Sequence, residues 1–407
     1  MESVISRFSN SSKCDVLIIG GGIIGISIGI AILESKSSLK VIIAEKEKNL
    51  GAHASGRNSG VLHAGFYYSP QSLKAKFCKD GNLELRKIAR KHNIPVLNTG
   101  KVIVARNSEE NKELDWLYAR GIKNGVDLEI RNSKDLTKFE PFAKSYERFL
   151  WSPNTGVSDP RAITRALAQD FIELGGIINF DSQVELVEVK GEIQDATGTY
   201  NASNIINAAG AQADRISRRI GVGLEYAMLP FMGLYRATEL QGLPLKTLVY
   251  PVPNKTNPFL GVHFTLTIDN KVKIGPTAIP VFGREQYSIF ENWSLSDIRQ
   301  SLKAIYAILT GKELKIISLA RNEALKFFEH NLVKQSAELV PNAALVPKWE
   351  SKPPGIRAQL VHLPTKNLEL DYVVRFYKNS THILNAVSPG WTSAIPFGRW
   401  ISERSSV

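Results

Sequence analysis

The hydrophobic pattern near the start of the chain is that of a βαβ unit. Residues 14–19 form a short apolar run rich in β-branched residues, which is typical of a buried parallel strand. Three glycines at 20–22 predict a tight turn, and the apolar stretch 23–35 predicts a helix. Residues 40–44 predict a second strand. The uncharged stretch 16–33 has the length of a membrane span, but the glycine interruption favours a strand, a turn and a helix.

The turn between the first strand and the helix carries the pattern G-x-G-x-x-G. Gly20 permits the sharp turn, Gly22 lets the backbone approach a pyrophosphate, and Gly25 lets the helix pack closely on the sheet. The N-terminus of that helix offers free N–H groups to phosphate. Glu45, twenty residues after Gly25, ends the second strand and can accept hydrogen bonds from ribose hydroxyls. The predicted dinucleotide site contains Gly20, Gly22, Ile23, Ile24, Gly25, Glu45 and Lys46.

The sequence that follows favours FAD over NAD. A nicotinamide domain would usually continue with further βα units, whereas residues 51–60 are mostly small and could wrap a flavin pyrophosphate and ring. Strand patterns at 183–189 and 204–210 come where a two-domain flavoprotein returns to complete its nucleotide site. A strand pattern at 383–386 precedes residues 388–393, where a helix start could aim N–H groups at the ring edge. Further cofactor contacts are predicted for His53, Ser55, Arg57, Asn58, Ser59, Val184, Ala209, Gly210, Pro389, Gly390 and Thr392.

Four segments carry a resemblance to a known family. They are HASGRNSGVLHAGFYYSPQSLKAKFC (53–78), YPVPNKTNPFLGVHFT (250–265), PPGIRAQL (353–360) and LNAVSPGWTSAIPFG (384–398). From residue 14 to about 404, the chain resembles the FAD-dependent L-2-hydroxyglutarate dehydrogenases and oxidases of the D-amino-acid-oxidase-like superfamily. The resemblance implies non-covalently bound FAD, a carboxylate substrate of the 2-hydroxy acid class and a 2-keto product. It also implies oxygen or a membrane quinone as electron acceptor.

The sequence departs from the family pattern at three positions. The family usually reads Pro-Phe-Arg-Gly-Glu-Tyr where this chain has Met232 and Leu234 in place of the two charged residues. Trp391 follows Gly390 where the family usually has small residues. These changes leave the FAD interpretation intact and keep two alternatives open. One is an FAD-dependent amine oxidase acting on glycine-like or D-amino acids, and the other is a flavin-binding protein that has lost catalysis.

Oxidation of a 2-hydroxy acid requires a base for the hydroxyl proton and a cation for the carboxylate. His63 and His263 lie in the first two segments, and either could be the base. Arg357 lies in Pro-Gly-Ile-Arg-Ala, where the superfamily has an arginine near the flavin, and its planar group can hold a carboxylate by two hydrogen bonds. Arg57 and Lys273 are second candidates for this cation. Substrate contacts are predicted for Tyr67, Tyr68, Tyr250 and Arg357.

Composition and charge narrow the class of protein. The 407 residues, 43% hydrophobic and 22% charged, are those of a globular chain of two or three domains. The net charge of 51 − 39 = +12 suits acidic small molecules or anionic lipid, and no zinc-finger spacing, RNP motif or Lys/Arg block indicates nucleic acid. Two cysteines exclude a disulfide framework, and no metal-ligand spacing occurs. We expect a cytoplasmic protein or one peripheral to the inner membrane, mitochondrial in a eukaryote.

The expected fold class is α/β, with a Rossmann-type FAD-binding domain interleaved with an α+β substrate domain on a mostly antiparallel sheet. The FAD-binding domain is expected at residues 1–90, 145–225 and 350–407, and the substrate domain at 91–144 and 226–349. Within the substrate domain the patterns predict strands in 96–105 and 261–276, mostly helix over 294–344, and a return linker at 346–355.

Overall fold

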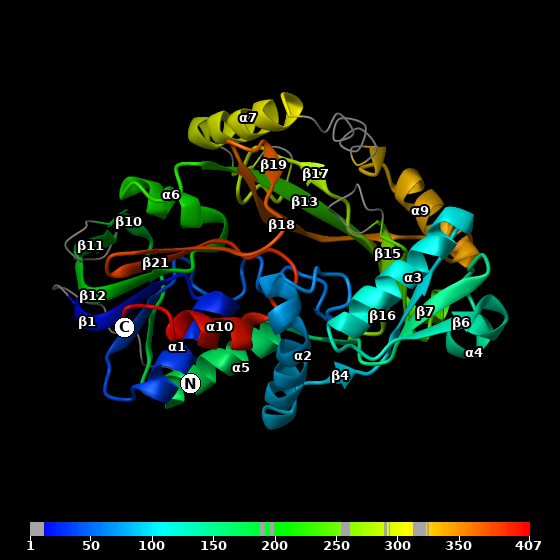
Figure 1. Ribbon diagram of the computed structural model, residues 1–407, viewed down its shortest axis with the longest axis horizontal. Helices are drawn as coiled ribbons and strands as arrows, with labels where there is room; N and C mark the ends of the chain where they lie inside the picture. The colour runs from blue at the N-terminus through cyan, green and yellow to red at the C-terminus, as the bar shows by residue number, and fades with distance from the viewer. Residues whose placement is uncertain are drawn as a thin grey trace.

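The computed structural model describes residues 12–187, 192–195, 199–253, 261–288, 291–292, 294–311, 323 and 325–407. Their strands form two large sheets and one small sheet, and Figure 1 shows one large sheet on the left of the view and the other extending from the top centre to the right. Four parts of the sequence predictions lie outside the described residues. They are 1–11 of the N-terminal tail, 188–189 of the strand pattern 183–189, 254–260 of the second family segment, and 312–322 and 324 of the predicted helical region.

The first sheet has the strand order β10-β11-β12-β1-β2-β9, with β21 paired to β12 and β20 paired to β21. Strands β21, β12, β1, β2 and β9 run parallel, which is the arrangement of a Rossmann-type sheet. The strands are β1 (Ser12–Ile19), β2 (Val41–Ala44), β9 (Ile177–Asn179), β10 (Val184–Val187), β11 (Glu192–Asp195), β12 (Thr199–Asn207), β20 (Val373–Tyr377) and β21 (Ser380–Asn385).

Both faces of this sheet are buried, as expected for parallel strands. Val16 and Ile18 of β1 belong to the core that packs against α1, α5 and α10, whereas Leu17 and Ile19 belong to the core that includes Ile216 of α6. In Figure 1, α1, α5 and α10 lie together below the sheet and α6 lies above it. These helices are α1 (Ile23–Ser35), α5 (Pro160–Glu173), α6 (Ala213–Arg219) and α10 (Ala394–Ser402). The long helix α2 (Leu73–Lys91) contacts α5 and α10.

The second sheet has the order β19-β18-β13-β16-β15-β14-β5-β7-β6, with β17 paired to β13. Its pairs are antiparallel except for β14 with β5. The strands are β5 (Lys101–Val104), β6 (Glu129–Asn132), β7 (Arg148–Ser152), β13 (Tyr226–Glu239), β14 (Leu248–Pro251), β15 (His263–Leu266), β16 (Lys271–Gly275), β17 (Ile279–Pro280), β18 (Glu350–His362) and β19 (Asn367–Leu368). The fold class predicted from the sequence is therefore confirmed.

The remaining elements surround these two sheets. A small sheet has the order β3-β8-β4, and α7 packs against β13 at the top of the view in Figure 1. These elements are β3 (Val61–Leu62), β4 (Val96–Leu97), β8 (Gly156–Ser158), α3 (Ser108–Lys123), α4 (Leu136–Phe139), α7 (Leu295–Leu309) and α9 (Glu329–Ala337).

Most of the longer helices begin with a side-chain cap, and α1 does not. Ser72, Asn107, Asp159 and Ser294 accept hydrogen bonds from the first backbone N–H groups of α2, α3, α5 and α7. The residue before α1 is Gly22, which has no side chain to accept these bonds. The N-terminus of α1 therefore keeps donors for another partner.

The βαβ prediction is confirmed, since β1, α1 and β2 occupy the expected residues and α1 has the predicted bounds. The apolar stretch 16–33 is divided between β1 and α1, and no helix among the described residues has the length and hydropathy to cross a membrane. The predicted strands and helices of the second region are also present, although shorter than expected: β5, β15, β16, α7 and α9 lie within them.

The predicted return linker at 346–355 is wrong in its second half, because β18 begins at Glu350 and pairs with β13. Pro353 and Pro354 lie where β18 has β13 on one side only, since β19 pairs with Val361 and His362 alone. A proline without an N–H is tolerated on such an open strand edge.

Sheet membership also departs from the predicted domain limits at three strands. β7, β18 and β19 fall inside the ranges 145–225 and 350–407 expected for the FAD-binding domain, yet all three hydrogen-bond in the second sheet. β7 and β18 pair there with β5, β6 and β13, which come from the other predicted domain. Apart from these three strands, the division into two domains stays a prediction.

Candidate active site

A cavity of about 900 Å³ lies at the carboxyl ends of β1, β2, β12 and β21. Ligands of open α/β sheets bind at this edge. Its wall continues onto the second sheet through Gly233, Tyr235 and residues 355–358. The cavity therefore lies between the two sheets, and residues of both sheets form its wall. Of the residues predicted to bind the cofactor, those in the wall are Gly20, Gly22, Ile23, Ile24, Glu45, Lys46, His53, Ser55, Arg57, Asn58, Ser59, Val184, Ala209, Gly210, Pro389, Gly390 and Thr392.

The glycine turn leaves no room for side chains. Gly20 has φ +106°, and a Cβ there would lie 2.7 Å from the carbonyl oxygen of Ala208. A Cβ on Gly25, which is not in the cavity wall, would lie 2.1 Å from the carbonyl oxygen of Gly20. Gly25 thus lets α1 pack against the turn, which is the task that the sequence pattern assigns to it.

Glu45 is bound to the glycine turn by backbone hydrogen bonds. The N–H of Gly21 donates to Oε2 of Glu45 at 2.8 Å, and the N–H of Glu47 donates to Oε1 at 2.9 Å. Burial raises the pKa of Glu45, and these two hydrogen bonds lower it in part. At the start of α1, the N–H of Ile23 donates to Oγ of Ser55 at 3.0 Å. Ser55 therefore connects residues 51–60 to the N-terminus of α1.

The segment 51–60 is held by polar contacts with Tyr287. The guanidinium of Arg57 lies 4.0 Å from the centre of the Tyr287 ring, and Nδ1 of His53 lies 2.6 Å from its hydroxyl. Nε2 of His53 lies 2.8 Å from a carboxylate oxygen of Glu47. Tyr287 also lines the cavity, and no sequence motif pointed to it.

Glu47, His53 and Glu285 lie close enough to hold a metal ion together. The ammonium of Lys46 lies 2.6 Å from Glu47 and 2.8 Å from Glu285. Lys46 therefore already supplies positive charge to both carboxylates, and we assign no metal to the cluster. Sequence spacing alone did not reveal this group, because Glu285 comes from a distant part of the chain.

His63 and Arg357 line the part of the cavity formed with the second sheet. His63 is buried, and its Nδ1 has no hydrogen-bond partner among the described residues. Burial lowers the pKa of His63 well below its usual value, and the charge of Lys101 lowers it further. His63 is therefore a neutral imidazole at physiological pH.

His263 is buried beside His63 but is not part of the cavity wall. Its ring stacks on Tyr250 with centres 3.8 Å apart, and its Nδ1 lies 2.8 Å from the carbonyl oxygen of Gly261. A carbonyl only accepts, so Nδ1 carries the proton and Nε2 is left as an acceptor. Burial lowers the pKa of His263 to about 3.

The three predicted tyrosines do not line the cavity. Tyr250 is fully buried on β14, and the hydroxyl of Tyr67 has no hydrogen-bond partner among the described residues. Tyr68 lies near Lys74, whose Nζ is 6.0 Å from the centre of its ring. Lys273, a second candidate for the carboxylate, lies 5.6 Å from the ring of cavity residue Tyr235.

Lys101 is a buried cation that sequence reasoning missed. It has no exposed surface, and its Nζ lies 4.4 Å from the centre of the Tyr250 ring. Burial lowers the pKa of Lys101 to about 7. One indication was present in the sequence, since Lys101 is the first residue of the otherwise apolar strand Lys101–Val104. A lysine at the end of a strand is usually exposed, so this pattern did not single out Lys101 as buried.

The two apolar departures from the family pattern are part of a small core. Met232 is buried against Val281 and Ile356, and Leu234 packs on the same cluster. Ile356 precedes Arg357 on β18, and Met232 pairs with Ile356 across the two strands. An apolar cluster therefore replaces two charges next to the strand that carries Arg357.

Comparison with known proteins identifies the family. Residues 15–404 match the family model described as FAD dependent oxidoreductase. The chain belongs to this family. The L-2-hydroxyglutarate dehydrogenase of Caenorhabditis briggsae mitochondria is 35% identical to it, covering 97% of this chain and 93% of that protein. The L-2-hydroxyglutarate dehydrogenase of Escherichia coli strain K12 is 34% identical, with 96% and 92% covered.

The solved structures agree on the fold. L-α-glycerophosphate oxidase from Mycoplasma pneumoniae, described with FAD bound, superimposes with a TM-score of 0.72 at 22% identity, covering 96% of this chain and 94% of that one. By its family and its relatives the protein is an FAD-dependent oxidoreductase. Its residues fit this cofactor, since the start of α1 has no side-chain cap and the cavity walls carry the glycine turn, Glu45 and residues 51–60.

Proposed function

We propose that the protein oxidises L-2-hydroxyglutarate to 2-oxoglutarate. The similarity to L-2-hydroxyglutarate dehydrogenases over nearly the full chain carries this proposal. The cavity supports it, because one wall belongs to the nucleotide-binding sheet and another carries a histidine and an arginine, His63 and Arg357. Met232 and Leu234 replace two charged residues of the family pattern, but His63 and Arg357 are both still present in the cavity wall.

We propose that Arg357 holds the carboxylate next to the reacting carbon. Its charge lowers the pKa of His263 and opposes the burial that raises the pKa of Tyr250, so the guanidinium lies close to both rings. Two parallel N–H donors would fix the plane of the carboxylate and thereby the position of the neighbouring carbon.

We propose that neutral His63 takes the proton of the C2 hydroxyl, with His263 as a neighbouring acceptor through Nε2. FAD, when bound, supplies the acceptor for the hydride that leaves C2. Loss of the hydroxyl proton and of the hydride turns the C–OH bond into the C=O bond of the keto acid. His63 is favoured over His263 because it lines the cavity.

Anaerobic reduction of the flavin tests the substrate directly. The holoenzyme is mixed with L-2-hydroxyglutarate, its D-enantiomer, L-lactate, glycine and D-alanine, and the loss of flavin absorbance is followed. Rapid bleaching with L-2-hydroxyglutarate alone is expected. Bleaching with glycine or D-alanine instead would assign the protein to the amine oxidases, and no bleaching with any of them would indicate lost catalysis.

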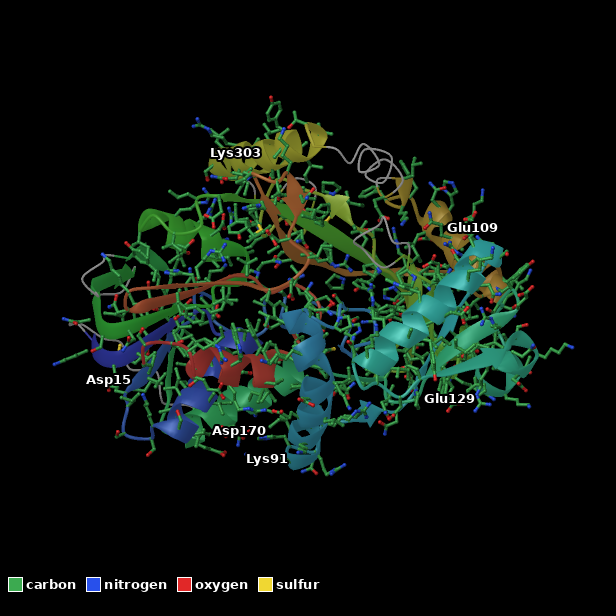
Figure 2. The ribbon with its side chains drawn as sticks, in the orientation of Figure 1. Asp15, Lys91, Glu109, Glu129, Asp170 and Lys303 are labelled. Atoms are coloured by element: carbon green, nitrogen blue, oxygen red, sulfur yellow. The ribbon has the colours of Figure 1, made fainter. Side chains whose placement is uncertain are left out.

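We also propose that α7 contacts an anionic membrane surface, where a quinone would receive the electrons. The exposed face of α7 carries apolar and basic side chains, one serine and no acidic side chain: Leu295, Ser296, Arg299, Leu302, Lys303, Tyr306 and Leu309. Figure 2 shows Lys303 on this helix at the outer surface. Such a face suits the interface of an anionic bilayer.

Vesicle co-sedimentation checks the membrane contact. Binding to vesicles with anionic lipid is expected, and the double substitution Leu302→Ser and Tyr306→Ser should abolish it without changing flavin reduction. Faster reoxidation by a soluble quinone analogue than by oxygen would support the acceptor. Equal sedimentation of the parent and the double variant would reject α7 as the contact.

A further inference from the structure

Three lysines are buried in the described part of the chain, and they differ in what balances their charge. Lys326 forms an ion pair with Glu323, and the carboxylate of Asp371 stabilises the charge of Lys74. No carboxylate acts on Lys101, and its Nζ has no hydrogen-bond partner among the described residues. An unpaired buried ammonium destabilises a protein, so the site has the chemistry of an anion receptor whose anion is not a residue of the chain.

The surroundings of Lys101 compensate its charge only in part. Its Nζ lies 4.4 Å from the ring centre of Tyr250, 4.8 Å from that of Tyr67 and 5.0 Å from that of Phe66. Aromatic faces attract a cation, but they do not satisfy three N–H donors. The nearby thiol of Cys78 stays protonated, because burial raises its pKa to about 12.

Lys101 lies close to the residues proposed for catalysis. β5 is paired with β14, which carries Tyr250, and β14 is paired with β15, which begins at His263. The charge of Lys101 lowers the pKa of His63, a residue of the cavity wall, and that of His263. The charge of Arg357 also lowers the pKa of His263. Two separate cations therefore act on His263: Arg357 in the cavity wall, and Lys101 buried outside that wall.

We propose that Lys101 binds the second carboxylate of a dicarboxylic 2-hydroxy acid whose first carboxylate is held by Arg357. This inference rests on the proposed function and assigns the residue that selects its substrate class. The carboxylate oxygens would accept the N–H donors that the aromatic rings leave unsatisfied. A substrate without the second carboxylate would leave the ammonium unpaired, and this difference sets the preference.

A pair of substrates that differ only in the second charge tests Lys101. In L-2-hydroxyglutaramate a neutral amide replaces the second carboxylate of L-2-hydroxyglutarate. Holoenzyme should prefer the dicarboxylate in kcat/KM by about 10²-fold, the usual scale for a buried charged contact. Lys101→Met should remove this preference by lowering kcat/KM for the dicarboxylate while the value for the amide is retained. Lys101→Arg should keep part of the preference.

A thermal unfolding measurement separates lost binding from lost folding. Without substrate, Lys101→Met should unfold at or above the temperature of the parent protein, because the substitution removes an unpaired buried charge and keeps an unbranched side chain. A lower unfolding temperature for Lys101→Met would argue that the ammonium is already satisfied in the free enzyme, and it would overturn the proposal.

The remaining outcomes are also decisive. If Lys101→Met slows both substrates equally, the lysine acts on the histidines and not on a carboxylate, which overturns the proposal. If the parent protein oxidises no hydroxy acid, the proposed function fails, and non-reactive glutarate and valerate still test Lys101 through the change in flavin absorbance. A preference for glutarate that Lys101→Met abolishes supports the dicarboxylate site, and equal affinities refute it.

Discussion

At the scale of single residues, burial decides the chemistry of the site. His63, His263 and Lys101 all have lowered pKa values because their charged forms are removed from water. The two imidazoles are thereby kept neutral and able to accept a proton. A histidine in a motif suggests a base near pH 7, but burial beside a lysine makes His63 a weaker base than its sequence position indicates.

The pH profile of flavin reduction reports this shift. With His63 as the base, the rate of anaerobic reduction at saturating substrate should stay level as the pH falls from 8 to 6.5, because the lowered pKa keeps the imidazole neutral. Saturation is needed because Lys101, with a pKa of about 7, changes its charge over this range. The acidic limb should lie below pH 6.5. Lys101→Met should move this limb to higher pH, since loss of a nearby positive charge favours the imidazolium. His63→Ala should slow reduction by about 10²–10⁴-fold and abolish the limb. A limb near pH 7 in the parent protein would contradict the assignment.

Arg357 gives a second prediction at this scale. Arg357→Lys replaces a bidentate donor by a single ammonium. The loss of transition-state stabilisation, calculated from the ratio of kcat/KM values, should be about 2–4 kcal/mol and should come mostly from a higher KM. Steady-state kinetics with L-2-hydroxyglutarate measures the loss. Arg375→Lys is the matched control, because Arg375 of β20 pairs with Glu225, is not part of the cavity wall and should tolerate the change. Equal effects of both substitutions would remove Arg357 from the substrate site.

At the scale of elements, the uncapped start of α1 is the feature that matters most. The other long helices α2, α3, α5 and α7 use side-chain caps, whereas α1 begins after Gly22 at the edge of the cavity. An uncapped N-terminus costs stability unless a ligand accepts its hydrogen bonds. The start of α1 can therefore bind an anionic group, which agrees with the phosphates of FAD, the cofactor of this family.

Gly25 tests the packing of this element. Gly25→Ala would place a Cβ 2.1 Å from the carbonyl oxygen of Gly20 and so push α1 away from the turn. We expect a destabilisation of about 1–3 kcal/mol, the range for overpacking, together with weaker FAD binding. Flavin content after gel filtration and the denaturant midpoint measure the two effects. Gly242→Ala is the control, because the nearest atom to its Cβ would lie 3.6 Å away. Full flavin retention in Gly25→Ala would contradict this account.

At the scale of the whole molecule, the cavity lies between the Rossmann-type sheet and the antiparallel sheet. The parallel sheet contributes its strand ends, and β18 and β13 of the antiparallel sheet contribute Gly233, Tyr235 and Arg357. A cofactor held by residues of both sheets would stabilise the folded chain without binding the unfolded one.

This coupling predicts a large effect of FAD on unfolding. At a free FAD concentration one hundred times its dissociation constant, the free energy of unfolding should rise by about 2.7 kcal/mol. Thermal unfolding of the apoprotein over a series of FAD concentrations measures the rise, and free riboflavin is the control, since it lacks the phosphates that the start of α1 would bind. An unfolding temperature independent of FAD would contradict a binding site between the sheets.

Local features were within reach of the sequence by itself. The strand, glycine turn and helix of the βαβ unit follow from local hydrophobic pattern and from the conformations that glycine alone adopts easily, and α1 has the bounds predicted for it. The family and its cofactor follow from the motifs, because FAD is bound largely by backbone groups at fixed spacing.

Long-range contacts were decided only by the tertiary structure. Pro353 and Pro354 suggested a linker, but pairing with β13 over one open edge made this segment a strand. Lys101 carried only a weak local signal, because its role depends on the absence of a carboxylate partner among its described neighbours on β14 and α2. The local sequence pattern indicates which secondary structure a residue favours. The burial of its side chain and the charges around it depend instead on which distant segments the fold brings next to it.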